Sequence, residues 1–223
     1  MKQLLALLPK KERVLIYISW SVKIAVLIAF ITAVFSNRIF VAALSLLALV
    51  LSFLPAMIEK QFRLILPPEF ETLLALFLYA SLVLGEFQDY YTRFHWWDLL
   101  LHSLSALMIG LIGFMIIYAL YRYHKVVFSP VFAAVFAFSF AMAIGAVWEI
   151  FEFSMDHFFA LNMQKSGLVD TMTDLIVDAI GALITSISGY FYLRGGDSLL
   201  IERFVKKFID LNERLFHKKK GFV

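Results

Sequence analysis

Six long apolar stretches dominate the pattern of this chain. Each approaches the roughly 20 apolar residues that a helix needs to cross the hydrocarbon core of a membrane. The third is the weakest, because it must continue through Glu86 to reach full length, but Pro67-Pro68 and Glu69 mark its start as a helix N-terminus. The pattern therefore predicts six transmembrane helices, at about residues 15–36, 39–58, 70–88, 98–121, 129–149 and 174–193.

The composition supports this interpretation. Of 223 residues, 62% are hydrophobic and 17% charged, and the mean hydropathy of +0.84 is too high for a soluble domain of this length. We therefore expect an all-α, polytopic membrane helix bundle. The chain has no cysteine, which excludes disulfides and Cys-ligated metals. The N-terminal apolar run ends at Pro9-Lys10-Lys11 without a small-residue cleavage pattern, so we expect the first span to stay in the mature protein.

Basic residues predict the orientation. With six spans, the N-terminus, the C-terminus and every second loop lie on one side. All lysines and arginines fall on that side except Lys23, Arg38, Arg93 and Lys165. The positive-inside rule then places both termini in the cytoplasm, with the protein in the plasma (inner) membrane. Lys23 lies about two turns into the first span, and we expect it to snorkel to the cytoplasmic surface.

The C-terminal segment has a different pattern. It reads as a basic amphipathic helix, and we expect a transmembrane domain at 1–195 and a cytoplasmic tail at 196–223. Two uses of this helix fit its period equally well: binding to the anionic inner leaflet, or packing on the protein's own cytoplasmic face. The tail lacks the aromatic interleaving of nucleic-acid-binding segments, so we expect membrane lipids and no nucleic acid as partners. Its apolar positions are Leu200, Phe204, Phe208, Leu211 and Leu215, and its basic positions are Arg203, Lys206, Lys207, Arg214 and Lys218-Lys219-Lys220.

Acidic residues gather where spans three to six should meet the outer surface. Buried acids must be neutralised, paired or bound to a cation, and only Arg93 and Lys165 lie in the same loops. Protons or a metal ion would have to balance the rest. These acids are Glu86, Asp89, Asp98, Glu149, Glu152, Asp156, Asp170, Asp174 and Asp178, together with His95, His102 and His157. For the outermost four, Glu86, Asp89, Asp156 and Asp170, we favour solvated loop positions.

Helical spacing brings the inner acids into pairs. Asp98 with His102 and Asp174 with Asp178 are separated by four residues, and Glu149 with Glu152 by three, so each pair shares a helix face. Small and polar residues continue these faces, which should therefore meet protein and not lipid, with the glycines used for close packing. The two longest faces are Ala141, Gly145, Glu149, Glu152 and Asp156, and Asp174, Asp178, Gly181, Thr185 and Ser188.

One imidazole among several carboxylates suits a divalent ion such as Mg, Mn, Fe or Zn. No recognised metal motif, P-loop or nucleophile elbow is present. Our leading hypothesis is a metal-dependent hydrolase or transferase that acts on a lipid or lipid-linked substrate at the outer leaflet. In it one carboxylate takes a proton from metal-bound water. The expected metal ligands are His102, Glu149, Glu152, Asp174 and Asp178, and the expected catalytic residues are Glu149, Glu152 and Asp98.

Two other functions use the same residues. A proton- or cation-coupled transporter would employ the carboxylates as a relay and needs a polar path continuing to the cytoplasm. A noncatalytic scaffold or lipid-binding protein would need them only for stability. Trp97 and Trp148, at expected outer helix ends, are typical interface anchors and could also wall a site.

Three segments resemble a known family. WWDLLLHSLSALMIG (96–110), WEIFEFSMD (148–156) and DTMTDLIVDAIGAL (170–183) resemble the YjdF-like inner-membrane proteins of bacteria and archaea, a domain of unknown function. The resemblance implies a multi-pass membrane protein and brings no established activity.

A fainter similarity is to the VanZ-like proteins, whose last helices carry an acid, then Asp, a polar residue four positions later, and Gly. Glu149 or Glu152, followed by Asp174, Asp178 and Gly181, is similar in order and spacing, although Asp178 stands where that family commonly has Asn. This similarity implies an envelope or lipid-linked substrate at the outer face.

Overall fold

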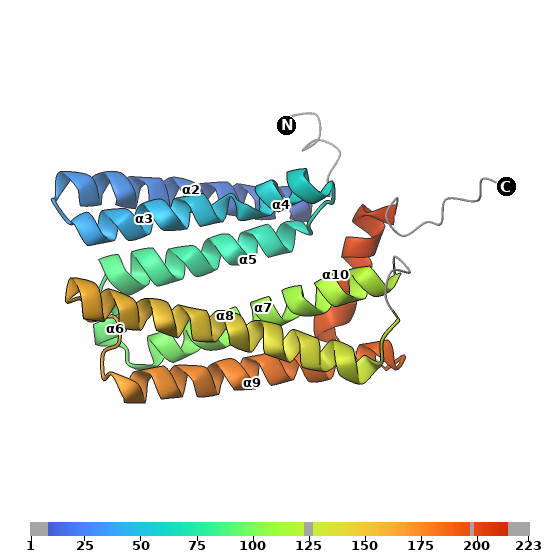
Figure 1. Ribbon diagram of the computed structural model, residues 1–223. Coiled ribbons are helices and arrows are strands. Elements are labelled where there is room, and N and C mark those ends of the chain that lie inside the picture. Colours follow the sequence, from blue (N-terminus) through green and yellow to red (C-terminus); the bar gives the residue numbers. More distant parts are fainter. Residues whose placement is uncertain (1–8, 123–126, 197–198, 214–223) are drawn as a thin grey trace. The chain divides into compact units, whose positions relative to one another are not determined.

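The computed structural model describes residues 9–122, 127–196 and 199–213, and it is helical throughout these ranges apart from short connections. Six helices are long and apolar enough to cross a membrane, which confirms the all-α, six-span prediction. The helices, labelled in Figure 1, are α2 (Lys10–Phe35), α3 (Ile39–Ser52), α4 (Leu54–Phe62), α5 (Pro68–Tyr79), the π-helix η1 (Ala80–Phe87), α6 (Tyr90–Arg93), α7 (Trp96–Arg122), α8 (Pro130–Phe159), α9 (Leu168–Leu193) and α10 (Leu199–Leu211).

The chain divides into two compact units, residues 1–97 and 98–223. In the first unit α2 packs against α3 and α5, as Figure 1 shows. Val26, Ala48, Leu78 and Leu82 form the core between these helices. The third span reaches full length because α5 continues directly into η1, which runs through Glu86 as expected.

A buried ion pair joins two helices of the first unit. The Lys23 ammonium on α2 lies 2.5 Å from Oε1 of Glu71 on α5, and the hydroxyl of Ser19 donates to the same oxygen at 3.0 Å. The Trp20 and Phe53 rings lie about the ammonium, with centroids 5.2 and 4.9 Å away. The expectation that Lys23 snorkels to the surface is therefore wrong: its side chain is 5% exposed, because a carboxylate within the bundle neutralises it.

The second unit is built on close approach of α7, α8 and α9. Small residues make that approach feasible: a Cβ on Gly181 of α9 would lie 2.8 Å from the Ser103 carbonyl of α7. On α8 the residues facing inward include Ala133, Ala137 and Ala141, each no more than 1% exposed. The helix faces of small and polar residues that were expected to meet protein are thus buried.

The residues on α9 divide by face. The buried face carries its polar and small residues, namely Asp174, Asp178, Gly181, Ala182, Thr185, Ser186 and Gly189. Ile176, Ile180 and Ile187 are each more than half exposed, as is typical of a helix whose outer face meets lipid. Ser188, expected on the inner face, is only half-buried, and Ser186 and Gly189 take its place.

Two spans extend well beyond the acids at which the apolar pattern stops. α8 continues ten residues beyond 149 to Phe159, and α9 begins at Leu168, six residues before 174. The pattern stops at the acids, but a helix continues wherever its backbone hydrogen bonds do. The extra turns carry Glu152 and Asp156 on α8 and Asp170 on α9.

The C-terminal helix α10 packs against its own unit. Ile201 and Val205 are fully buried in a core with Phe114, Tyr118 and Ala137. The structure shows α10 packed on the protein itself, which is the second of the two predicted uses. Its buried residues are Ile201, Val205, Phe208 and Asn212, whereas Phe204 and Leu211 of the predicted apolar face are half-buried. Leu215 and the final lysines lie outside the described residues, and the division at 195/196 stays a prediction.

Candidate metal centre

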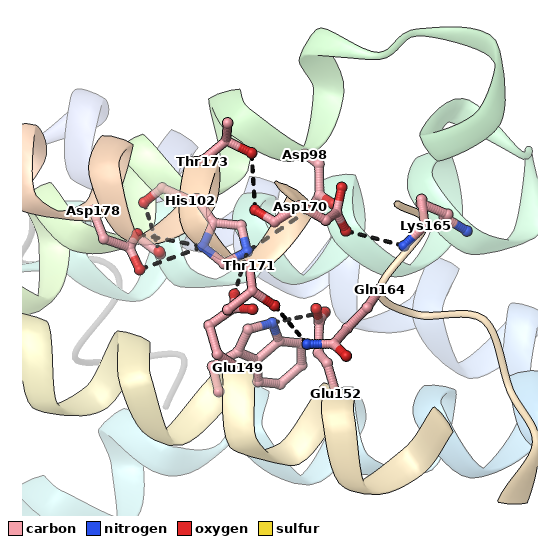
Figure 2. Close-up of polar contacts among 12 residues, drawn as sticks. Asp98, His102, Glu149, Glu152, Gln164, Lys165, Asp170, Thr171, Thr173 and Asp178 are labelled. Atoms are coloured by element: carbon pink, nitrogen blue, oxygen red, sulfur yellow. Dashed lines mark hydrogen bonds and ion pairs between the residues drawn. The ribbon is translucent and has the colours of Figure 1, made fainter. Parts of the chain in front are cut away.

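Three helices bring a histidine and two acids together in the second unit. His102 on α7, Glu149 on α8 and Asp174 on α9 each offer one ligand atom, and these atoms lie within 4.8 Å of one another. All three side chains are buried, with exposures of 7%, 4% and 1%. The close-up in Figure 2 shows the acids of α7, α8 and α9 around the imidazole of His102. The predicted convergence of the inner residues thus exists in the structure.

Both ring nitrogens of His102 face carboxylates. Nδ1 is 3.3 and 3.4 Å from the two oxygens of Asp178, while Nε2 is 3.8 Å from Oε1 of Glu149 and 3.9 Å from Oδ1 of Asp98. The Nδ1 contact is close to hydrogen-bond length and the Nε2 contacts are too long for one. Asp178 therefore favours the tautomer protonated at Nδ1, with the lone pair of Nε2 facing Glu149 and Asp98.

Several buried carboxylate oxygens of this cluster lack a hydrogen-bond partner among the described residues. Such groups are rare in native proteins, because an unpaired buried carboxylate is costly. The Trp148 indole, on the same helix as Glu152, donates to Oε1 of Glu152 at 3.0 Å, so Trp148 contacts the cluster through Glu152. Among the described residues, the oxygens that form no hydrogen bond are both of Glu149, Oε2 of Glu152, Oδ2 of Asp174 and Oδ1 of Asp178, the last of which still lies 3.3 Å from Nδ1 of His102.

Gly145 provides the space that Asp178 occupies. A Cβ at position 145 would lie 2.3 Å from Oδ2 of Asp178, so any side chain there would displace the carboxylate. The sequence pattern indicated close helix packing for this glycine. The structure adds that what packs against it is a charged side chain of the site, and Gly145 is therefore a positioning residue for Asp178.

A second acidic group adjoins the first. Asp98, Asp170 and Asp174 also have ligand atoms within 4.8 Å of one another, so Asp174 belongs to both groups. Asp98 has a 20% exposed side chain and Asp170 is half-buried. The pattern favoured a solvated loop position for Asp170. It instead lies on the first turn of α9, because that helix starts earlier than its apolar run indicates.

The loop between α8 and α9 is held close to the cluster by its own hydrogen bonds. Asp156 accepts from the backbone N–H groups of Met163 and Gln164 at 2.6 and 2.8 Å. Asp170 accepts from the N–H of Lys165 at 3.0 Å, as Figure 2 shows. Gly167, with φ +64°, permits the turn into α9, since side chains rarely adopt that conformation. Asp156 is thus a structural residue of the loop.

The remaining candidates are not part of the cluster. Glu86 and Asp89 belong to the first unit, and Asp89 is exposed at the start of α6. His157 is exposed, and its ring stacks on Phe153 with centroids 5.7 Å apart. Trp97 donates to the Ala80 carbonyl at 3.3 Å, a contact within the first unit.

Comparison with known proteins extends the sequence resemblance. The chain is 30% identical over 129 residues to an uncharacterized protein of Thermotoga maritima, a match covering 58% of this chain and 66% of that protein, just under two thirds. No solved structure matches the chain. These comparisons do not bear on the VanZ-like similarity, which stays a prediction. A model of the family described as "Predicted membrane protein (DUF2238)" matches residues 18–195, most of the chain including every residue of the cluster, and the protein therefore belongs to this family of multi-pass membrane proteins.

Proposed function

We propose that this protein is a membrane enzyme that binds a divalent metal ion between His102, Glu149 and Asp174. The observation that carries the proposal is the convergence of these three ligand atoms within 4.8 Å, beside buried carboxylate oxygens that form no hydrogen bond within the described part of the chain. Each unpaired buried charge is costly, and a bound cation would satisfy several at once. Two ligand atoms that are each about 2.1 Å from one ion lie about 3 to 4.2 Å apart, and the 3.8 Å between Nε2 of His102 and Glu149 falls in that range.

The orientation of the His102 imidazole supports its role as a metal ligand. Metal-binding histidines commonly donate their second N–H to a carboxylate, which fixes the tautomer and raises the basicity of the ligating nitrogen. Asp178, facing Nδ1 at 3.3 Å, has the position of that carboxylate. In this proposal Asp178 orients His102 and does not itself bind the ion, a narrower role than the sequence pattern predicted.

The chemistry we propose is hydrolysis or group transfer on a lipid or lipid-linked ester. In hydrolysis, the oxygen of water forms a bond to the carbon or phosphorus of the ester, and the bond from that atom to the leaving oxygen breaks. A carboxylate accepts the proton of the water and returns it to the leaving oxygen. Glu152, oriented through Trp148, is our candidate for this proton transfer, and a bound divalent ion would lower the pKa of the water.

The substrate class follows from the location of the cluster. Its ligands lie within spans, close to the starts of α7 and α9 and well along α8. Substrates reaching such a site from the bilayer would be amphipathic, with an apolar chain beside the exposed apolar residues of α8 and α9. Taken with the positive-inside pattern, the site would open to the outer leaflet.

A transporter would need polar groups beyond the cluster. Thr185 continues the polar face of α9 and donates to the Leu107 carbonyl at 3.1 Å. Farther along the same helices, Phe114, Tyr118 and Ala137 form an apolar core, and Gly189 packs directly against the Phe114 ring. Among the described residues this apolar layer favours a site open on one side, and hence an enzyme over a proton relay.

Metal analysis tests the proposal. Protein purified in detergent without chelator and resupplied with divalent metals is measured by elemental mass spectrometry, with His102→Ala and Asp174→Asn alongside. We expect near-stoichiometric metal in the wild type and loss in both variants. Asp210→Asn, which changes an exposed acid of α10, is the matched control and should retain the metal. Wild-type protein without metal, or variants that keep it, would overturn the proposal.

A further inference from the structure

The second acidic group has the composition of a cation site in its own right. Asp98 and Asp170 come from the first turns of α7 and α9, and Asp174 lies one turn further along α9. The ligand atoms of the three residues lie within 4.8 Å of one another. Clustered acids are common without an ion, but a buried carboxylate oxygen without a hydrogen bond is rare. The side chain of Asp174 is 1% exposed, and its Oδ2 has no hydrogen-bond partner among the described residues.

The two groups differ in chemistry and in access to water. The inner group contains an imidazole and is buried. The outer group offers carboxylate oxygens alone, the ligands that Mg²⁺, Mn²⁺ and Ca²⁺ prefer. Asp98 and Asp170 are partly exposed, so an ion there would keep some of its water. Such a site should bind more weakly and exchange faster than the inner one.

A protein cation competes for the outer group. Lys165 adjoins the outer group, since its backbone N–H donates to Asp170 at 3.0 Å. Figure 2 shows Lys165 beside Asp170 and Asp98. One lysine is too little charge for three neighbouring carboxylates, and it cannot ligate an ion while protonated. Lys165 should therefore weaken ion binding at the outer group without replacing it.

We propose that Asp98, Asp170 and Asp174 bind a second divalent cation of the hard, oxygen-preferring class, and that Asp174 bridges it to the ion of the inner group. This rests on the proposed function, because Asp174 serves both ions. A carboxylate-bridged pair is the arrangement by which two ions act on the attacking and leaving oxygens of one reaction. The candidate centre is therefore binuclear and asymmetric, with one tight and one exchangeable position.

Titration with Mn²⁺ alone tests this, with bound ions counted by elemental analysis and their coupling followed by electron paramagnetic resonance. We expect two ions in the wild type and a spin-coupled signal, which a lone ion does not give. Asp170→Asn should retain one uncoupled ion, and it keeps an oxygen to accept the Lys165 N–H. Asp98→Asn should also retain one uncoupled ion. Agreement between the two variants would exclude a folding defect in one of them as the cause. Lys165→Gln should tighten the weaker ion several-fold.

Failure of this proposal is separable from failure of the proposed function. A wild type that binds one ion, with Asp170→Asn and Asp98→Asn unchanged, would overturn the second site and leave the inner one standing. A wild type that binds none would overturn both. Glu149→Gln reports on the inner position, and we expect it to lose the tight ion and the coupled signal. Two ions without coupling would contradict the bridge through Asp174.

Discussion

Each unit of this protein buries charge, and the two do so in opposite ways. In the first unit the buried Lys23 is paired with Glu71 at 2.5 Å, and the Ser19 hydroxyl donates to the same carboxylate oxygen. In the second unit His102 is surrounded by the carboxylates of Asp98, Glu149 and Asp178, and several of the buried oxygens form no hydrogen bond with any residue that the structure describes. An ion pair whose charges cancel needs no further counter-ion, whereas a cluster with more carboxylates than cations requires protons or a bound cation. Under the function proposed above, this difference separates a structural use of buried charge from a functional one.

Removing one partner of the balanced pair should have the largest effect on stability. Glu71→Ala leaves the Lys23 ammonium buried without a counter-ion, and we expect the free energy of unfolding to fall by about 3 kcal/mol. Denaturation in detergent micelles measures this. The matched control is the double variant Lys23→Met, Glu71→Leu, which removes both charges and should recover most of the loss. A single variant as stable as the wild type would show that the pair is not structural.

The unbalanced cluster should respond to ions instead. At a free divalent ion concentration of 100 times its dissociation constant, binding stabilises the native state by about 2.7 kcal/mol. We expect the melting temperature of the wild type to rise with added metal and to fall with chelator, while that of Asp174→Asn stays constant. An equal rise in both proteins would mean that the ion binds elsewhere.

Gly145→Ala tests whether packing supports the site chemistry. The added methyl group would displace Asp178 and so release Nδ1 of His102. Loss of such a supporting carboxylate typically lowers metal affinity about 10- to 100-fold, and we expect an effect of that size in metal titrations. In an Asp178→Ala background the same substitution should cost little further affinity. Equal losses in both backgrounds would assign Gly145 to helix packing alone.

The smallest expected effect has the opposite sign. Without metal, the acids of the cluster repel one another, so Glu149→Gln should stabilise the chelated protein by about 1 kcal/mol. In the first unit the corresponding change, Glu71→Gln, should destabilise. Chemical denaturation of both variants in chelator makes the comparison, and a destabilised Glu149→Gln would contradict a cluster that requires a cation.

The helices and the pairing of residues on each face follow from local rules. Apolar length predicts the spans, and spacing of three or four predicts that Glu149 with Glu152, and Asp174 with Asp178, share buried faces. These predictions are confirmed, because they depend only on helix geometry. Predictions of function and metal binding stay predictions.

Contacts between residues far apart in the chain could not be predicted from the sequence. Lys23 and Glu71 are 48 residues apart, and no periodicity reports a partner on another helix. Asp170 was placed in a loop because the apolar run begins at Asp174, whereas α9 begins at Leu168. Val169 and Met172 are apolar residues three positions apart just before Asp174, and this helical spacing is the signal that could have indicated the earlier start.

The packing of α10 has a consequence for biosynthesis. Ile201 and Val205 complete the core formed by Phe114, Tyr118 and Ala137, yet they are translated after all six spans. During synthesis the spans can enter the bilayer in order, while the C-terminal end of α7 and the N-terminal end of α8 still lack the α10 side chains that pack against them. Final packing of the second unit therefore requires a segment that is translated after all six spans, so a chain whose spans are already inserted lacks part of its core until that segment is made.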